Sequence, residues 1–265
     1  MRPLAVVGNL SRDLVDGETR PGGPPYYAAR ALRVLGRPAI VAVKAADVDR
    51  RLLLPPLVRL GLPVLWRSGE STAAFSFSYD GDRREMVVDE LGPSWTPEDL
   101  RGLERAPWVH VGALARSDFP AVTLAALARD RRLSFDGQGL VRPDRKGPLE
   151  LDRDFDPDLL RHISVLKLDE DEARALVGEP DADALRSLSI PEVVVTLGSR
   201  GALVLADGQL QPVPARLLDG AVDPTGAGDA FSAAYLAGRA SGYAPAPAAQ
   251  RATALVAGLL GRRFR

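Results

Sequence analysis

A short run of small residues near the C-terminal end of the chain finishes with a carboxylate. Residues 223–231 read Asp-Pro-Thr-Gly-Ala-Gly-Asp-Ala-Phe, and an alanine-rich stretch with helical spacing follows. Gly226, Ala227 and Gly228 allow consecutive N–H groups to face one hollow, to which the positive end of the helix dipole adds. Asp229 in the first turn could accept a proton from an attacking hydroxyl. The pattern predicts a phosphoryl-transfer site, although a capped turn without chemistry would also favour an acidic residue here.

The same string resembles the C-terminal signature of the ribokinase-like (PfkB) family of carbohydrate and nucleoside kinases. In that family the last Asp is the catalytic base and the Gly-Ala-Gly backbone forms the anion hole. The resemblance therefore implies these roles for Asp229 and for Gly226, Ala227 and Gly228, with Thr225 at the nucleotide. It also implies ATP as the donor, Mg²⁺ as a cofactor and, in some members, a monovalent cation near Asp223.

Polar residues directly after the first predicted strand are candidates for binding the acceptor. Asn9 and Asp13 follow an apolar run, at the strand end where open α/β sheets bind ligands. A carboxylate can accept hydrogen bonds from neighbouring sugar hydroxyls, and the family places an Asp here, although a solvated loop Asp is the alternative.

A glycine pair downstream resembles the family's N-terminal signature. Gly22 and Gly23 precede a predicted helix and could let backbone N–H groups approach a substrate. Tyr27 stands where the signature usually has Asn. A Tyr-Tyr form is more similar to the branch of inositol, polyol and nucleoside kinases, and Tyr27 either packs on a substrate ring or belongs to the core.

Residues 135–142 read Phe-Asp-Gly-Gln-Gly-Leu-Val-Arg after another predicted strand, and resemble the Asp-x-Gln-Gly segment of some family members. We expect Asp136 and Gln138 either to touch the substrate or to hold this loop. Arg142 either faces a phosphate or lies at the surface.

An acidic stretch, residues 167–172, enters a helix and resembles the family's Asn-x-x-Glu motif, which organises Mg²⁺ and nucleotide phosphates. The resemblance implies that Glu172 and Asp169, the latter in place of Asn, bind the metal, and that Lys167 and Asp169 lie at the nucleotide. Carboxylate oxygens suit Mg²⁺, which usually keeps several waters. Favourable interaction with the helix dipole is the simpler explanation for the acidic residues between them.

A third stretch, residues 196–201, is similar to the family's Thr-x-Gly-x-x-Gly nucleotide turn. It implies that Thr196, Gly198 and Gly201 contact the nucleotide. The motif is weak alone, but it occurs in the expected order between the acidic stretch and the Gly-Ala-Gly-Asp turn.

The elements that must position these residues alternate along the chain, which predicts a doubly wound, mainly parallel sheet flanked by helices. Buried parallel strands are expected at Leu4–Val7, Ala39–Val43, Trp108–Val111, Leu133–Phe135, Val165–Leu168, Val193–Leu197 and Ala202–Leu205. Helices are expected at Tyr26–Leu35, Arg50–Leu60, Ala121–Arg131, Asp171–Val177 and Ala230–Ala240, with a loop at Ser241–Ala248.

Residues 72–88 depart from this pattern because they alternate as a strand and contain a predicted turn at Asp80-Gly81. We expect a single domain over residues 1–265, with a small antiparallel lid formed by about 11–20 and 72–90. An edge hairpin of the main sheet is the alternative. Phe75, Phe77 and Tyr79 could offer an apolar face to a second copy, so a homodimer through the lid is a hypothesis.

Composition removes several other classes of protein. The chain has 265 residues, a formal net charge of −1 and no cysteine, which argues against a nucleic-acid partner and excludes disulfides and thiolate metal sites. No apolar stretch reaches the length of a membrane span, so we expect a cytoplasmic protein without a membrane partner.

Two further phosphate-binding schemes fail, because the Gly-x-Gly-x-x-Gly pattern of dinucleotide-binding folds and the Walker A sequence are both missing. The sequence therefore predicts an ATP-dependent kinase acting on an alcohol of a small sugar, polyol or nucleoside. A degenerate member of the same fold that only binds a sugar or nucleotide is the alternative.

Overall fold

The computed structural model describes residues 2–15, 17–80, 83–216 and 223–261, with the backbone alone for 78–80 and 83–85. In this part of the chain nine strands form one sheet in the order β14-β13-β12-β11-β9-β8-β1-β4-β5. The strands are β1 (Leu4–Asn9), β4 (Ala39–Ala46), β5 (Val64–Gly69), β8 (Trp108–Gly112), β9 (Arg132–Asp136), β11 (Val165–Asp169), β12 (Glu192–Thr196), β13 (Ala202–Ala206) and β14 (Gln209–Val213).

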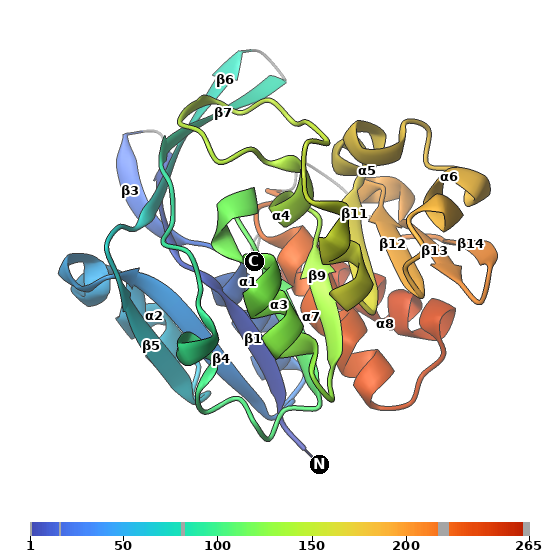
Figure 1. The fold of residues 1–265 in the computed structure, drawn as a ribbon, viewed down its shortest axis with the longest axis horizontal. Helices are drawn as coiled ribbons and strands as arrows, with labels where there is room; N and C mark the ends of the chain where they lie inside the picture. The colour runs from blue at the N-terminus through green and yellow to red at the C-terminus, as the bar shows by residue number, and fades with distance from the viewer. Residues whose placement is uncertain (1, 16, 81–82, 217–222, 262–265) are drawn as a thin grey trace.

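Helices cover both faces of this sheet (Figure 1). They are α1 (Pro24–Val34), α2 (Arg50–Val58), α3 (Ala121–Ala128), α4 (Gln138–Val141), α5 (Glu170–Val177), α6 (Ala182–Ser187), α7 (Ala227–Ala240) and α8 (Pro245–Gly261). Apolar residues of α3, α5 and α6 pack on one face, and those of α1, α2, α7 and α8 pack on the other. The predicted doubly wound sheet is confirmed.

Two predictions about individual elements were wrong. The strand at β13 runs antiparallel to β12 because only residues 197–201 join them, too few for a parallel crossover. The second is the loop expected at Ser241–Ala248, which ends before Pro245, where α8 begins. Proline is tolerated in the first turn of a helix. Edge strands β5 and β14 were not predicted: β14 has no continuous apolar run, and the run in β5 is limited to its first three residues, Val64, Leu65 and Trp66.

A second sheet has the strand order β10-β7-β6-β2-β3. Its strands are β2 (Ser11–Val15), β3 (Glu18–Gly22), β6 (Ala73–Asp80), β7 (Arg83–Glu90) and β10 (Gly147–Pro148). The hairpin therefore belongs to a separate small sheet, and the alternative of an edge hairpin of the main sheet was wrong. The sheet is mixed, because β2 pairs with β6 in parallel. Gly81 of the predicted turn lies outside the described residues.

The second sheet stands near the carboxyl ends of the parallel strands, where β1 leads directly into β2 (Figure 1). Its apolar side packs against the same chain: Phe75 is buried with Val88 and Leu114, and Phe77 and Leu149 pack around them. The side chain of Tyr79 lies outside the described residues. Phe75 is therefore unavailable to a second copy, whereas Phe77 is only partly buried, and the homodimer through the lid stays a prediction.

Candidate active site

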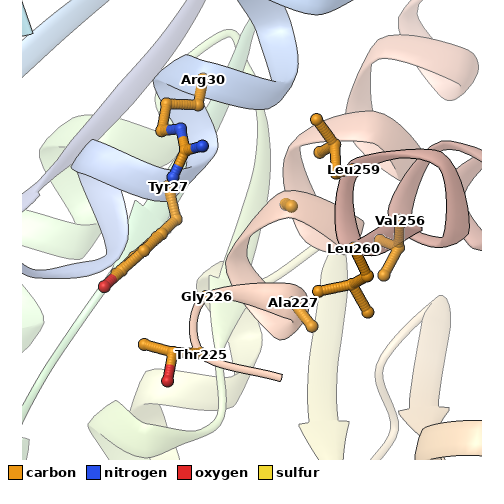
Figure 2. Close-up of a pocket in the computed structure, with 9 residues that line it drawn as sticks. Tyr27, Arg30, Thr225, Gly226, Ala227, Val256, Leu259 and Leu260 are labelled. Atoms are coloured by element: carbon orange, nitrogen blue, oxygen red, sulfur yellow. The ribbon is translucent and has the colours of Figure 1, made fainter. Parts of the chain in front are cut away.

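The turn that opens α7 has the backbone shape that the sequence predicts. Gly226 adopts φ +74° at the start of the helix, and a Cβ added there would lie 2.1 Å from the Tyr27 ring. Glycine is required at this position both for its conformation and for the close approach of Tyr27. Figure 2 shows Tyr27 of α1 reaching toward the turn that contains Thr225 and Gly226. Tyr27 thus has a packing role in the structure.

One of the three predicted anion-hole amides is already engaged. The N–H of Ala227 donates to the carbonyl of Pro224 at 2.9 Å, and the N–H of Thr225 donates to Asp223 Oδ1 at 2.9 Å. The first N–H groups of an α-helix have no acceptor within the helix. The amides of Gly228 and Asp229, the next two residues of the same turn, are therefore better placed than Ala227 to bind an anion.

Asp229 lies in the first turn of α7 and is partly buried. Burial raises the pKa of Asp229 to about 7, and the negative charges of Asp136 and Asp13 act in the same direction. The positive charges of Lys167 and Arg142 oppose this rise. Residues from five separate segments of the chain thus share one electrostatic environment around the predicted base.

Lys167 supplies a buried positive charge beside this turn. Its Nζ lies 3.5 Å from Asp136 Oδ2 and 4.0 Å from Glu172 Oε2, and a Cβ added at Gly228 would lie 3.0 Å from it. Burial alone lowers the pKa of Lys167, but the surrounding carboxylates outweigh it and raise the pKa above its ordinary value. The ammonium group therefore stays charged against the backbone of α7.

The predicted metal residues Asp169 and Glu172 interlock as a helix cap. Asp169 Oδ1 accepts from the N–H of Glu172 at 2.8 Å, and Glu172 Oε2 accepts from the N–H of Asp169 at 2.8 Å. This reciprocal pair is a capping box for α5. The acidic spacing is thus explained by capping, which engages one carboxylate oxygen of each residue, and the role of Asp169 as a metal ligand stays a prediction.

Glu172 retains one open oxygen. Its Oε1 is buried without a hydrogen-bond partner among the described residues, and burial raises the pKa of Glu172 to about 8 while Lys167 opposes the rise. No group of three or more His, Cys, Asp or Glu residues in the described ranges could hold a metal ion by itself. A carboxylate oxygen is a suitable ligand for Mg²⁺. An ion that is also bound by the phosphates of a substrate needs only one or two carboxylates from the protein.

Asp13 reaches the site from the second sheet. Ser11 Oγ donates to Asp13 Oδ1 at 2.7 Å, and a Cβ at Gly22 would lie 2.0 Å from Asp13 Oδ2. A Cβ at Gly23, which has φ +99°, would lie 2.6 Å from the carbonyl oxygen of Asn9. The glycine pair is therefore required for close packing beside Asp13, a reason that differs from the predicted approach of a substrate.

Asn9 has a structural role instead of the predicted contact with a substrate. It is fully buried, its Nδ2 donates to Pro93 O at 3.0 Å, and its Oδ1 accepts from Trp95 Nε1 at 2.9 Å. Asp118, which no sequence motif indicated, is buried next to it and accepts from the N–H of Leu114 at 2.8 Å. Burial raises the pKa of Asp118 to about 7. We leave Asn9 out of the substrate site because both ends of its amide are engaged.

The loop after β9 brings two more polar groups to the same edge. Asp136 is fully buried, and its Oδ1 accepts from the N–H of Gln138 at 3.3 Å, so it holds the loop as predicted in one of the two alternatives. The Oε1 of Gln138 is buried without a partner in the described chain. This oxygen is available to a ligand hydroxyl.

The predicted nucleotide turn closes β12 onto β13. Thr196 Oγ1 donates to Leu168 O at 3.2 Å, and Gly198 and Gly201 adopt φ +58° and +104°. A Cβ at Gly201 would lie 2.1 Å from the carbonyl oxygen of Val213. The turn itself thus requires the glycines, and their contact with a nucleotide stays a prediction.

A small cavity lies behind the Gly226 turn, between α1, α7 and α8 (Figure 2). It offers about 20 Å³ and is lined by Tyr27, Arg30, Thr225, Gly226, Ala227, Ala230, Val256, Leu259 and Leu260. That volume holds about one water molecule. The cavity is therefore too small for a sugar or a nucleotide.

Sequence comparisons support an enzyme that transfers phosphate. Residues 85–261 match the model of the pfkB family carbohydrate kinases. The chain is 31% identical to a fructokinase of Klebsiella pneumoniae, over 89% of this chain and 84% of that protein. It is 36% identical to a cytidine kinase of Thermococcus kodakarensis, over 91% of this chain and 90% of that protein.

Solved structures agree with the fold. A pyrophosphate-dependent kinase of the ribokinase family, complexed with a pyrophosphate analog and myo-inositol, superposes with a TM-score of 0.84 at 26% identity, covering 97% and 94% of the two chains. Arabidopsis thaliana ribokinase, complexed with ribose and ATP, gives 0.73 at 19% identity, covering 98% and 92%. Together with the match over two thirds of its length, these findings show that the chain belongs to the pfkB family of carbohydrate kinases.

Proposed function

We propose that this kinase transfers a phosphoryl group to a hydroxyl of a small sugar, polyol or nucleoside, with Asp229 as the general base. The observation that carries the proposal is the position of Asp229 in the first turn of α7, with its pKa raised to about 7 by burial. A base is most effective when its pKa is close to the working pH. Asp229 can therefore hold or release a proton under ordinary conditions.

The chemical step needs only groups that surround this turn. A carboxylate oxygen of Asp229 takes the proton from the acceptor hydroxyl, whose oxygen forms a bond to phosphorus as the bond to the leaving phosphate breaks. The amides of Gly228 and Asp229 and the ammonium of Lys167 stabilise the negative charge on the transferring group. With ATP as donor, the products are ADP and the phosphorylated acceptor.

Mg²⁺ fits this arrangement as a partner of the donor phosphates. Glu172, with its open Oε1, is the residue that would hold the ion, directly or through water. When bound, Mg²⁺ neutralises part of the phosphate charge. The monovalent cation near Asp223 stays a prediction, as does the contact of Thr225, Thr196, Gly198 and Gly201 with the nucleotide.

Pyrophosphate is a second candidate donor. Its support comes from the solved pyrophosphate-dependent kinases, two of which superpose on this chain with TM-scores of 0.84 at 25–26% identity. The acceptor candidates extend from fructose-like sugars to inositols and cytidine-like nucleosides, since the relatives are named for such substrates.

We further propose that the second sheet acts as a lid over the acceptor, within a single domain spanning residues 1–265. Asp13 of β2 supports this role because it brings a carboxylate from that sheet into the environment of Asp229. A closed lid would exclude water, which competes with the acceptor hydroxyl.

The test is donor consumption across a panel of pentoses, hexoses, inositols and nucleosides, with Mg²⁺ and either ATP or pyrophosphate. Acceptor-dependent turnover by the wild type, reduced at least about a hundredfold in Asp229→Asn, is expected from loss of the base. Retained activity in Asp229→Asn would remove Asp229 from this role. Binding of donor without turnover of any acceptor would favour the binding-only alternative.

A further inference from the structure

Arg142 occupies an unusual position beside the candidate site. It follows α4, where its N–H donates to Gln138 O at 3.0 Å and its carbonyl accepts from the N–H of Arg116 at 3.0 Å. Its backbone is therefore fixed between two loops at the carboxyl edge of the sheet. Its side chain is only partly exposed.

The guanidinium of Arg142 has no oxygen acceptor in the described part of the chain. Its Nη1 lies 3.9 Å from the sulfur of Met86 on β7, and its Nε is buried without a partner. A guanidinium carries five N–H donors in a fixed planar arrangement, and a thioether is a weak acceptor. Leaving a buried charged donor unpaired is costly unless a ligand supplies the acceptor.

Arg116, in the neighbouring loop, shows what a purely structural arginine looks like here. Its Nε and Nη2 donate to Leu140 O at 3.1 and 3.0 Å, and it forms an ion pair with Asp152. Arg145, three residues after Arg142, pairs with Glu150 at 3.3 Å. Arg142 differs from both because its charge is held close to the site and no carboxylate among the described side chains pairs with it.

The charges around Arg142 connect it to the reacting groups. Burial raises the pKa values of the carboxyl groups of Asp118, Glu172 and Asp229. The positive charge of Arg142 opposes the rise in all three. None of these carboxylates forms a salt bridge with Arg142 in the described chain. The guanidinium is thus near several acids but bound to none.

We propose that Arg142 is a catalytic residue that binds the oxygens of the phosphoryl group during transfer, an inference that rests on the proposed kinase function. A planar guanidinium matches the geometry of phosphate oxygens, and a phosphoryl group spreads its transition-state charge over its equatorial oxygens. Lys167 provides a point charge from the strand β11, whereas Arg142 approaches from the loop after β9. The two cations would hold the group from different directions.

Kinetics of Arg142→Met and Arg142→Lys test this role, with Arg145→Met as the matched control. We expect kcat of Arg142→Met to fall about a thousandfold, the lower range for an arginine in phosphoryl transfer, with little change in the KM of the acceptor. Arg142→Lys should recover part of the loss, because it keeps charge but not the bidentate geometry. Added guanidinium ion should partly rescue Arg142→Met, a result that a structural role would not give.

Binding of inorganic pyrophosphate, measured by calorimetry, provides a readout that does not need turnover. The proposal expects binding by Arg142→Met to be at least about tenfold weaker than by the wild type, as for loss of hydrogen bonds to a charged group, and unchanged binding by Arg145→Met. Thermal unfolding of each variant identifies any that fail to fold, in which case Arg142→Lys carries the test.

The outcomes separate this inference from the proposed function. If the wild type phosphorylates no acceptor, the proposed function fails, and pyrophosphate binding alone decides the role of Arg142. Unchanged kcat and unchanged pyrophosphate binding in Arg142→Met would overturn the inference. The inference would also be overturned if Arg142→Met only raised the KM for acidic acceptors and left kcat unchanged. Arg142 would then bind an acidic substituent of the acceptor and not the phosphoryl group in transfer.

Discussion

At the scale of single residues, the carboxyl group of Asp229 determines how activity should depend on pH. Because burial raises its pKa to about 7, the group is largely protonated in mildly acidic solution and cannot accept another proton. We expect kcat/KM to rise with pH and to reach half its limit near pH 7, the value for the free enzyme. A pH profile of the rate measured with donor and acceptor both well below saturation checks this, and a flat profile between pH 5 and about 8 would contradict it.

The same raised pKa makes ionised Asp229 unfavourable for stability. In the unfolded chain the group ionises near the ordinary aspartate pKa, so the folded state binds more protons between about pH 4 and about 7 and its free energy of unfolding falls as pH rises through that window. Asp229→Asn removes this effect. We expect it to raise Tm above neutral pH by about 2 to 4 °C, the shift for about 1 kcal/mol in a domain of this size, and to have little effect at acidic pH.

Two glycines of the same turn should respond differently to alanine. Gly226→Ala places a Cβ into the Tyr27 ring at φ +74°, so we expect a loss of about 1–3 kcal/mol in the free energy of unfolding. Gly228 lies in the helix, and a Cβ added there would contact only the end of the Lys167 side chain, 3.0 Å from Nζ. We expect Gly228→Ala to keep the free energy of unfolding of the wild type but to lose activity, because the added methyl group displaces the ammonium group of Lys167. Denaturant unfolding and kinetics of both variants make the comparison; equal stabilities would contradict it.

At the scale of elements, the capping box explains why the acidic stretch lies where it does. Asp169→Ala should lower the free energy of unfolding by about 1 kcal/mol, because the N–H of Glu172 loses its acceptor. Asp169→Ser restores a capping oxygen and should recover that stability. Urea unfolding measures both. If Asp169→Ser unfolds like Asp169→Ala, capping is not the main role of this residue.

A second link between elements fixes α7 on the sheet. Tyr235 donates its hydroxyl to Glu192 Oε2 at 2.7 Å, and Arg239 donates three further hydrogen bonds to the same carboxylate. The C-terminal half of α7 is thus held to β12 by a hydrogen bond and an ion pair with Glu192. The same helix carries Asp229 in its first turn.

At the scale of the whole molecule, the second sheet is joined to the loop after β9 through β10. Leu149, next to β10, donates its N–H to Met86 O at 2.9 Å and packs into the apolar cluster beneath the sheet. Leu149→Ala should loosen this packing and increase donor hydrolysis in the absence of acceptor, relative to transfer. The ratio of released ADP to phosphorylated product measures this effect. Val122→Ala, at an exposed position of α3, is the control and should leave the ratio unchanged.

The sequence alone determined the class of fold and the position of the turn before α7. Short continuous apolar runs that alternate with helical segments are typical of buried parallel strands, so β1, β4, β8, β9, β11 and β12 were predictable. The Gly-Ala-Gly-Asp spacing likewise places a carboxylate in the first turn of a helix whatever surrounds it. Edge strands β5 and β14 were missed because most of their residues are half-exposed or exposed, and only the start of β5 carries a short apolar run.

Only the tertiary structure decided which polar residues are open to a ligand. Sequence motifs assigned three residues to the site that have other contacts in the structure. The side chain of Asn9 is hydrogen-bonded inside the protein, Asp169 caps α5, and Gly22 allows close packing beside Asp13. Asp118 and the unpaired guanidinium of Arg142 emerged only once loops distant in sequence met at one edge of the sheet. The physical reason is that local spacing fixes backbone shape, whereas burial and hydrogen-bond partners depend on contacts between distant segments.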